Sequence, residues 1–599
     1  MRRCLAALVC LLALGPSIAR AADAPTQPAY DDRGNLVDTP LAPTPEPKRL
    51  DERRATARLL AHPKVADWLG RYPPRPTTEA TFDEDARTWT VKAWSGKAGQ
   101  IALGTVDDAS GHVTEAWTGP QVAWKMARGS DGAFGGKQIN NPVVWLVFCG
   151  AFLLGLGDLR RPLSLRNLDL LALLSFSLSL WFFNRGDVFW AVPLVYPPFA
   201  YLIGRLAWIG IRGRRAPASR PLWPVWVLAA ATVFLAGFRV GLNVQDSNVI
   251  DVGYAGVIGA HRIANGQAPY GHMPTQGDLK ACGPADSEGE IRQRIQTNGR
   301  CEASNDRGDT YGPVAYAAYL PGFWSLGWTG KWDDLPAAHF TSIAFDLLCL
   351  VGLALVGLRF GGARLAATLA FAWVAYPFTQ YASSSNTNDS VLPAFLIFGF
   401  LFLTAPWARG AFAAWAGWTK FAALVVAPLW LTYGSRGRPR RSWWTYAGGF
   451  VLATAVAFAV LLLEPDPLHA ARVFAERTIG WQIGRESPFS LWDWRQYHAA
   501  GIPDLHLVQR LLQVALVVAA LAAAFVPRVK SPLQLAALTG ALIAGFEVVL
   551  THWSWLYLPW FYPFAAIALV AAAPRSRPRR EVEPIRDASS EQRALVPAG

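Results

Sequence analysis

The chain has 599 residues, of which 52% are hydrophobic and 27 are Trp, and its mean hydropathy is +0.20. This composition excludes a single soluble domain, and charged or Pro/Gly-rich joints divide the apolar stretches, so we expect a multi-pass membrane protein. The net charge of +13 would suggest a nucleic-acid partner in a soluble protein. Here the basic residues cluster in short joints, at 158–166, 212–220, 435–441 and 575–580, and therefore indicate the cytoplasmic side of a membrane and no nucleic-acid partner.

The N-terminal part predicts three segments in series. Residues 1–22 are typical of a secretory signal peptide, with Arg2 and Arg3 before an apolar run and a small-x-small cleavage site; an uncleaved anchor is the alternative. Residues 23–49 are rich in Pro, Asp and Thr and predict a linker. Residues 50–137 combine a helical pattern over 50–72 with alternating segments at 79–94 and 100–117, which predicts a small external α+β domain. Its WTVKAW and VDDASGHVTEAWTG stretches resemble a PepSY-type domain, which implies a binding or regulatory module.

The remainder predicts a mainly α, polytopic fold with about 13 transmembrane helices. Three of these, within 142–211, are accessory to the main group within 222–573, and residues 574–599 form a cytoplasmic tail. An external N-terminus and an internal basic tail require an odd number of crossings, which holds if 411–433 is a pair of short helices hinged near Lys420. We therefore expect a protein of the plasma (inner) membrane with its N-terminal domain outside.

This topology gathers the polar candidates on the outer side, in loop 243–336, at 383–389, in 464–505 and at His552. Asp246 and Asp251 follow a span directly, and the apolar spacing after Asp251 predicts a helix lying in the membrane interface. Cys282 and Cys301 share the long loop in an oxidising compartment, so we expect a disulfide between them, with two free thiols as the alternative.

These residues suit sugar transfer from a lipid-linked donor. Nucleotide sugars are absent outside the cytosol, so the donor would be a polyprenyl-phosphate sugar, and its site needs a base, cations for the departing phosphate and an apolar groove. Asp251 or Asp246 would deprotonate the acceptor hydroxyl. The candidates for phosphate binding are Arg477, Arg485, Lys420 and His552.

The order of several short motifs carries a resemblance. A span is followed by the Asp loop ending in GQAPYG, then by YGPVAYAAYLPGF at 311–323 and GWTKFAALVVAPLWL at 417–431. Over 222–573 this order resembles the GT-C superfamily of glycosyltransferases and is most similar to glycosyltransferase family 87, the polyprenyl-phosphate-mannose-dependent mannosyltransferases. The resemblance implies that Asp251, in DVGY, is the base, and it implies inversion at the anomeric carbon without an obligatory metal or cofactor. Secondary site candidates are Asn388, Asp389, Tyr254 and Tyr311.

Plainer explanations compete with each assignment. Either Asp can be a helix cap, and the same holds for Asn388 and Asp389, while the arginines can be interfacial cations. A transporter or flippase is the first alternative function, since several ionisable residues lie within spans, and a non-catalytic sensor or scaffold is the second. The expected partners are a polyprenyl-phosphate sugar, an envelope glycan or glycolipid acceptor, and the bilayer.

Overall fold

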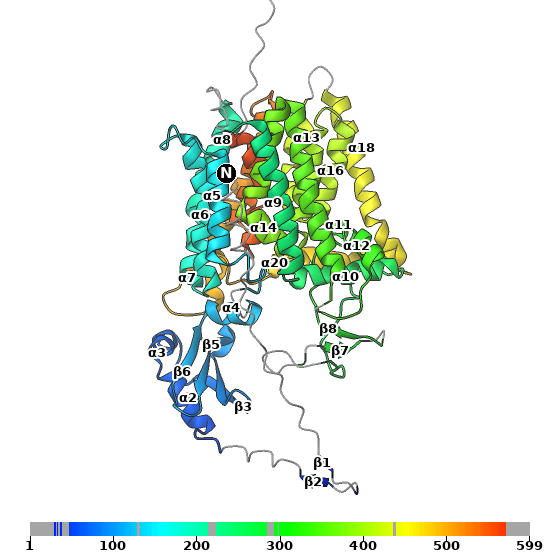
Figure 1. Ribbon diagram of the computed structural model, residues 1–599. Coiled ribbons are helices and arrows are strands. Elements are labelled where there is room, and N and C mark those ends of the chain that lie inside the picture. The colour runs from blue at the N-terminus through cyan, green and yellow to red at the C-terminus, as the bar shows by residue number, and fades with distance from the viewer. Residues whose placement is uncertain are drawn as a thin grey trace, which may run out of the picture.

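The computed structural model describes residues 29–30, 33, 36–38, 47–128, 132–213, 223–283, 291, 293–296, 299–332, 334–434 and 439–570. Within them the chain forms a helical bundle with a small α+β domain at one end (Figure 1). The predicted signal peptide, residues 1–22, and the predicted tail, residues 574–599, lie outside the described residues. Part of the predicted linker is described and contains the paired strands β1 (Ala29–Tyr30) and β2 (Leu36–Asp38).

The α+β domain, called the N-terminal domain below, has helices and strands in the predicted order. Its elements are α2 (Glu52–Leu60), α3 (Pro63–Leu69), β3 (Thr77–Asp83), β4 (Thr88–Trp94), η1 (Gly96–Ala98), β5 (Gln100–Asp107), β6 (Val113–Thr118) and α4 (Pro120–Arg128). The strands form an antiparallel sheet in the order β3-β4-β5-β6. Alternate residues of β4 are buried, and α2 covers that face through Ala55 and Leu59.

Residues 79–94 form a hairpin, although the alternation predicts one continuous segment. The chain reverses after Asp83, whose carboxylate accepts hydrogen bonds from the backbone N–H groups of Asp85 and Ala86. Arg87 closes the turn with a φ of 53°. A carboxylate that bonds to its own turn is a local effect, which hydrophobic periodicity does not register.

Six helices of the described chain are long and apolar enough to cross a membrane: Leu165–Asn184, Val188–Arg212, Val225–Gln245, Pro336–Ala375, Arg441–Leu463 and His506–Phe525. Four shorter apolar helices accompany them: Pro142–Leu156, Asn388–Leu401, Phe421–Thr432 and Pro532–Val548. The chain is thus a mainly helical, membrane-embedded protein.

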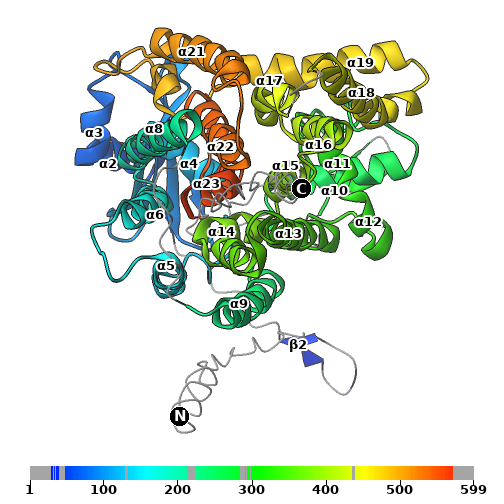
Figure 2. The same cartoon turned by 90° about the horizontal axis from the view of Figure 1, so that it is seen from above.

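The long helices of the bundle lie side by side (Figures 1 and 2), and the elements of this part of the chain fall into three groups in chain order. The first group is α5 (Pro142–Leu156), α6 (Leu165–Asn184), α7 (Val188–Ala191), η2 (Pro193–Val195), α8 (Tyr196–Arg212) and α9 (Val225–Gln245). The middle group is α13 (Pro336–Ala375), α14 (Pro377–Ser384), η3 (Asn388–Ser390), α15 (Val391–Leu401), α16 (Pro406–Thr419), η4 (Phe421–Val426), α17 (Ala427–Thr432), α18 (Pro439–Phe458) and η5 (Ala459–Leu463). The last group is α19 (Pro467–Ala475), η6 (Glu476–Gly480), α20 (Trp481–Gly484), η7 (Leu491–Tyr497), α21 (His506–Phe525), α22 (Pro532–Val548), η8 (Trp555–Tyr557) and α23 (Tyr562–Val570).

Two backbone breaks divide continuous apolar sequence into separate helices. Gly362 has φ 71° and ψ −168° inside α13, so that element is two helices joined by a turn. The two helices approach so closely that a Cβ on Gly357 would lie 2.4 Å from the backbone of Ala366. Lys420 is extended, with φ −144° and ψ 131°, between the end of α16 and the start of η4. The hinge predicted near Lys420 is therefore present.

A buried ion pair ties the centre of the bundle together. Arg239 on α9 donates to the carboxylate of Asp346 on α13 and also to Thr379 Oγ1 at 3.0 Å. Trp373, on the second half of α13, donates from Nε1 to Asp346 Oδ1 at 2.9 Å. Buried charges persist where they are paired and hydrogen-bonded, so these ionisable residues hold helices together.

The N-terminal domain and the long loop after α9 lie at the same end of the bundle (Figure 1). The loop contains α10 (Asp251–Ala264), β7 (Gln293–Ile295), β8 (Cys301–Ala303), α11 (Pro313–Ala317) and α12 (Leu320–Leu326). The domain docks on the bundle through Trp68, whose ring centroid is 5.6 Å from that of Phe189. Arg71 and Ala500 add two hydrogen bonds, of 3.1 and 3.2 Å.

Candidate active site

A cavity of about 750 Å³ lies at the end of the bundle nearest the N-terminal domain. It brings together Asp251, Asp389, Arg485 and His552, which come from four separate segments of the chain. Aromatic rings and small polar side chains complete its wall. The lining residues are Met126, Ala127, Ala133, Phe134, Phe183, residues 247–252, Tyr311, Trp332, His339, Asp389, Arg485, Phe489 and residues 552–557.

Asp251 is the first residue of α10, and its side chain is exposed to the cavity. Enclosure by the surrounding protein raises the pKa of Asp251 above its ordinary value, while the positive charge of Arg485 acts in the opposite direction. A carboxylate with a raised pKa is a better proton acceptor than an ordinary one. Asp251 therefore has the position and the basicity that a general base needs.

Arg485 is oriented by His552. Its Nη2 donates to His552 Nε2 at 3.1 Å, and because a guanidinium only donates, we assign the ring proton to Nδ1. Nδ1 then donates to Ser487 Oγ at 3.0 Å. Burial and the nearby cations Arg485 and Lys420 lower the pKa of His552 well below its ordinary value, so the ring is neutral at pH 7. His552 positions the guanidinium, which differs from the predicted role of a cation that contacts phosphate directly.

Lys420, at the hinge, forms a buried ion pair with Asp389. The Nζ atom lies 2.5 Å from Asp389 Oδ1, which also accepts from Trp560 Nε1 at 2.9 Å. Thr387 Oγ1 donates to the other carboxylate oxygen at 2.6 Å. The rings of Tyr557 and Trp560 each have their centroid 4.9 Å from Nζ. The charge of Lys420 is thus balanced by Asp389, and of the two only Asp389 lines the cavity.

Tyr311 also lines the cavity, with its ring centroid 5.5 Å from Lys420 Nζ. Burial and the negative charge of Asp251 raise the pKa of Tyr311 well above its ordinary value. The phenol therefore keeps its proton and is a hydrogen-bond donor to the cavity.

Two predicted site residues, Asp246 and Arg477, do not reach this cavity. The Asp246 carboxylate accepts a hydrogen bond from the backbone N–H of Gln138. Arg477 Nε donates to both carboxylate oxygens of the fully buried Asp309, at 2.9 and 2.8 Å. The Arg477 guanidinium neutralises this buried carboxylate, and the ion pair stabilises the long loop. The structure thus gives both side chains partners outside the cavity, and their predicted roles at the site stay predictions.

Tyr254 and Asn388 are also outside the cavity lining. The Tyr254 hydroxyl donates to the carbonyl oxygen of Ala303 at 3.1 Å, which connects α10 to β8 within the long loop. Asn388 is buried in η3, next to Asp389. Their predicted secondary roles at the site stay predictions.

Sequence reasoning missed the residues that support the charged groups. Tyr557 and Trp560 belong to the aromatic segment after His552, which an interfacial belt explains equally well. Ser487 has no motif of its own and is defined by its bond to His552. Thr387 carried a usable signal, because Thr is among the preferred N-cap residues. It caps η3, and its Oγ1 accepts from Asp389 N at 3.3 Å.

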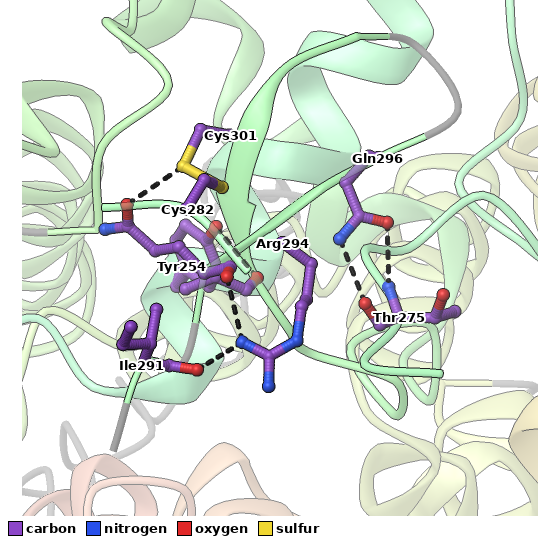
Figure 3. The surroundings of a disulfide bond; sticks show 9 residues. Tyr254, Thr275, Cys282, Ile291, Arg294, Gln296 and Cys301 are labelled. Atoms are coloured by element: carbon purple, nitrogen blue, oxygen red, sulfur yellow. Dashed lines mark hydrogen bonds between the residues drawn. A yellow bond between two sulfur atoms is a disulfide. The ribbon is translucent and has the colours of Figure 1, made fainter. Parts of the chain in front are cut away.

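The predicted disulfide between Cys282 and Cys301 is present in the long loop (Figure 3). In the same loop, two hydrogen bonds of 2.9 and 3.1 Å connect the Gln296 side chain, just after β7, to the backbone of Thr275. A disulfide and side-chain hydrogen bonds therefore stabilise the loop that begins at Asp251.

A second hollow, an open apolar groove of about 540 Å³, begins two residues after Tyr311. Its lining comes from α10, α11, α12, α13, α15, α16, α18 and η5. The lining residues are Ile263, Pro313, Val314, Ala317, Ala318, Pro321, Phe345, Phe395, Trp415, Val456, Ala457, Ala459, Val460 and Leu463. The segment from Tyr311 to Val314 thus joins the charged cavity to an apolar one.

Comparison of the chain with protein-family models, with curated proteins and with solved structures gave no match.

Proposed function

We propose that this protein is an integral membrane glycosyltransferase that moves a sugar from a polyprenyl-phosphate donor to an envelope glycan or glycolipid on the outer face of the membrane. The observation that carries the proposal is the meeting of Asp251 with Arg485 in one cavity, with an apolar groove whose lining begins two residues after the cavity residue Tyr311. A base, a phosphate-binding cation and a lipid site are the three parts that this chemistry requires.

In the proposed reaction, Asp251 accepts the proton of an acceptor hydroxyl as that oxygen attacks the anomeric carbon from the face opposite the phosphate. The bond from the anomeric carbon to the phosphate oxygen breaks, its electron pair leaves with the phosphate, and the configuration inverts. Arg485 gives one N–H to His552 and has further donors for the phosphate oxygens. The Tyr311 hydroxyl supplies another donor to the same cavity.

The groove suits the isoprenoid chain because it is open and its lining is almost entirely apolar. Its position next to Tyr311 lets a lipid lie in the groove while its phosphate reaches Arg485. The transferred sugar is a hexose or pentose in this proposal, and the sequence resemblance suggests mannose.

We propose that the cavity faces away from the cytosol. The helix ends opposite the cavity carry exposed basic residues in short connections, which favours a cytoplasmic position for that end. These residues are Arg160, Arg161, Arg212, Arg364 and Arg528. The proposal includes about 13 crossings, with the shorter apolar helices paired or shielded by their neighbours, and a cytoplasmic C-terminus.

A transporter is less well supported. The intramembrane residues Arg239 and Asp346, which that alternative would use along a path, are paired with each other and buried. The charged residues Asp251, Asp389 and Arg485 line the cavity at the end of the bundle instead.

The test uses purified protein in detergent or nanodiscs with a set of polyprenyl-phosphate sugars, and measures sugar release and transfer. Wild type is expected to turn over at least one donor, and Asp251→Asn to lower kcat roughly 100- to 10,000-fold while still binding donor. The matched control is Asp278→Asn, which changes an exposed carboxylate of the same loop and should keep wild-type turnover. Full activity of Asp251→Asn, or no turnover of any donor by wild type, would refute the proposal.

A further inference from the structure

One wall of the cavity belongs to the N-terminal domain and the segment that joins it to α5. Met126 and Ala127 come from the end of α4, and Ala133 and Phe134 from the connection that follows. The domain therefore contributes directly to the cavity, and the bundle alone does not enclose it.

Hydrogen bonds fix this wall to the segment that leads into Asp251. Asn248 Nδ2 donates to the carbonyl oxygens of Gly132 and Ala133, at 2.6 and 3.2 Å. Asp246 accepts from the backbone N–H of Gln138. Gly136, with φ 86°, passes so close that a Cβ there would lie 2.5 Å from the Asp246 carbonyl oxygen.

The connection is also braced internally. Asn140 Nδ2 donates to the carbonyl oxygens of Phe134 and Gly136, both at 2.7 Å, and Asn140 Oδ1 accepts from Asn184 Nδ2 at 2.7 Å. Phe134 is thus held at the cavity by a network that reaches α6. An aromatic ring in a fixed place is what a specific binding wall requires.

The elements of this wall and those of the apolar groove come from different sides of the bundle. In Figure 1, α4 lies beneath the part of the bundle that contains α5 to α7, whereas α10, α11 and α12 lie at the other side, and Figure 2 shows the same separation. The groove begins at α11, so a donor that occupies it approaches Asp251 from that side. With the donor on the groove side, the wall that includes Met126 and Phe134 is the part of the cavity that we assign to the acceptor.

We propose that Phe134, Met126 and Asn248 form the acceptor subsite, and that the N-terminal domain selects the acceptor glycan. The inference rests on the proposed function and extends it to the acceptor. The Phe134 ring packs on the apolar face of a sugar ring, the Met126 side chain covers an adjacent face, and the Asn248 amide oxygen accepts from a sugar hydroxyl. Asn248 also holds the wall beside the base, so it is a positioning residue as well.

Binding is measured first, without any donor. Purified protein is titrated with soluble mannose, glucose, galactose and arabinose oligosaccharides while its intrinsic Trp fluorescence is followed. We expect saturable quenching by at least one of them in wild type, and a dissociation constant about tenfold higher in Phe134→Ala. The matched control is Trp190→Ala, which removes an exposed aromatic ring at the same end of the bundle that does not line the cavity, and its affinity should equal that of wild type.

Turnover separates this proposal from the proposed function. With a donor present, Phe134→Ala should raise the acceptor KM about tenfold and leave the KM for the donor unchanged. Oligosaccharide binding by wild type without any transfer would reject the glycosyltransferase and keep the carbohydrate site. The acceptor subsite is rejected if wild type binds none of the oligosaccharides, or if Phe134→Ala binds them as tightly as wild type does.

Discussion

The ion pair between Lys420 and Asp389 offers the sharpest test of the site's architecture. Both side chains are buried, at 8% and 1% exposure, so each charge depends on the other. In Lys420→Met the Asp389 carboxylate keeps Trp560 and Thr387 as donors but loses its counter-ion. Removing one partner of a buried pair costs about 3–5 kcal/mol, and we expect a loss of that size in the free energy of unfolding.

Asp389→Asn removes the other partner of the ion pair and should lower the free energy of unfolding by a similar amount. The amide oxygen still accepts from Trp560, and the Thr387 hydroxyl can rotate to accept from the new NH₂ group. What is lost is the counter-charge of Lys420, so this substitution should also cost about 3–5 kcal/mol. The double variant removes both charges and should cost about 3 kcal/mol less than the sum of the single changes.

The assay is reversible denaturation of the four proteins in the same detergent, analysed as a double-mutant cycle. Lys331→Met, on the exposed part of the long loop, is the control and should change stability by less than about 0.5 kcal/mol. The reasoning fails if the free energy of unfolding of Lys420→Met stays within about 1 kcal/mol of the wild-type value, because a buried carboxylate without a counter-ion should destabilise the fold by more than that.

Two further predictions concern pH and the second arginine. Turnover needs ionised Asp251, and the pKa of Asp251 is raised, so activity should be present at neutral pH and fall on acidification through a pKa above the ordinary value of about 3.9. His552 is neutral and should add no step near pH 6.5. A pH profile of kcat/KM without a fall on the acid side would contradict this prediction. Arg477→Met should make the long loop sensitive to limited proteolysis and destabilise it by about 3 kcal/mol without changing the KM for the donor. The control Arg472→Met, at an exposed position on α19, should have neither effect. A raised KM for the donor in Arg477→Met would instead support a role of Arg477 at the phosphate.

Local patterns predicted much of the scaffold. Apolar length predicted the long helices, the charge pattern predicted a break at Lys420, and loop context predicted the bond between Cys282 and Cys301. The segment after Asp251 is helical, as its apolar spacing indicates. These features depend on neighbouring residues or on composition, so a single sequence carries them.

The choice among chemically equivalent residues did not follow from local pattern. Arg477 and Arg485 are eight positions apart and look alike in sequence. One pairs with Asp309, 168 residues away, and the other with His552, 67 residues away. Periodicity contains no record of such partners, which is why both arginines were predicted to bind phosphate.

The amino-acid sequence by itself determined that this is a polytopic helical protein whose polar residues concentrate in a few connections, because apolar length and charge position are properties of the chain. Only the tertiary structure decided that Asp251 and not Asp246 faces the cavity, that Lys420 is balanced by Asp389, and that the N-terminal domain supplies a wall. The physical reason is that burial, counter-charge and hydrogen-bond partners are set by segments that meet only after folding.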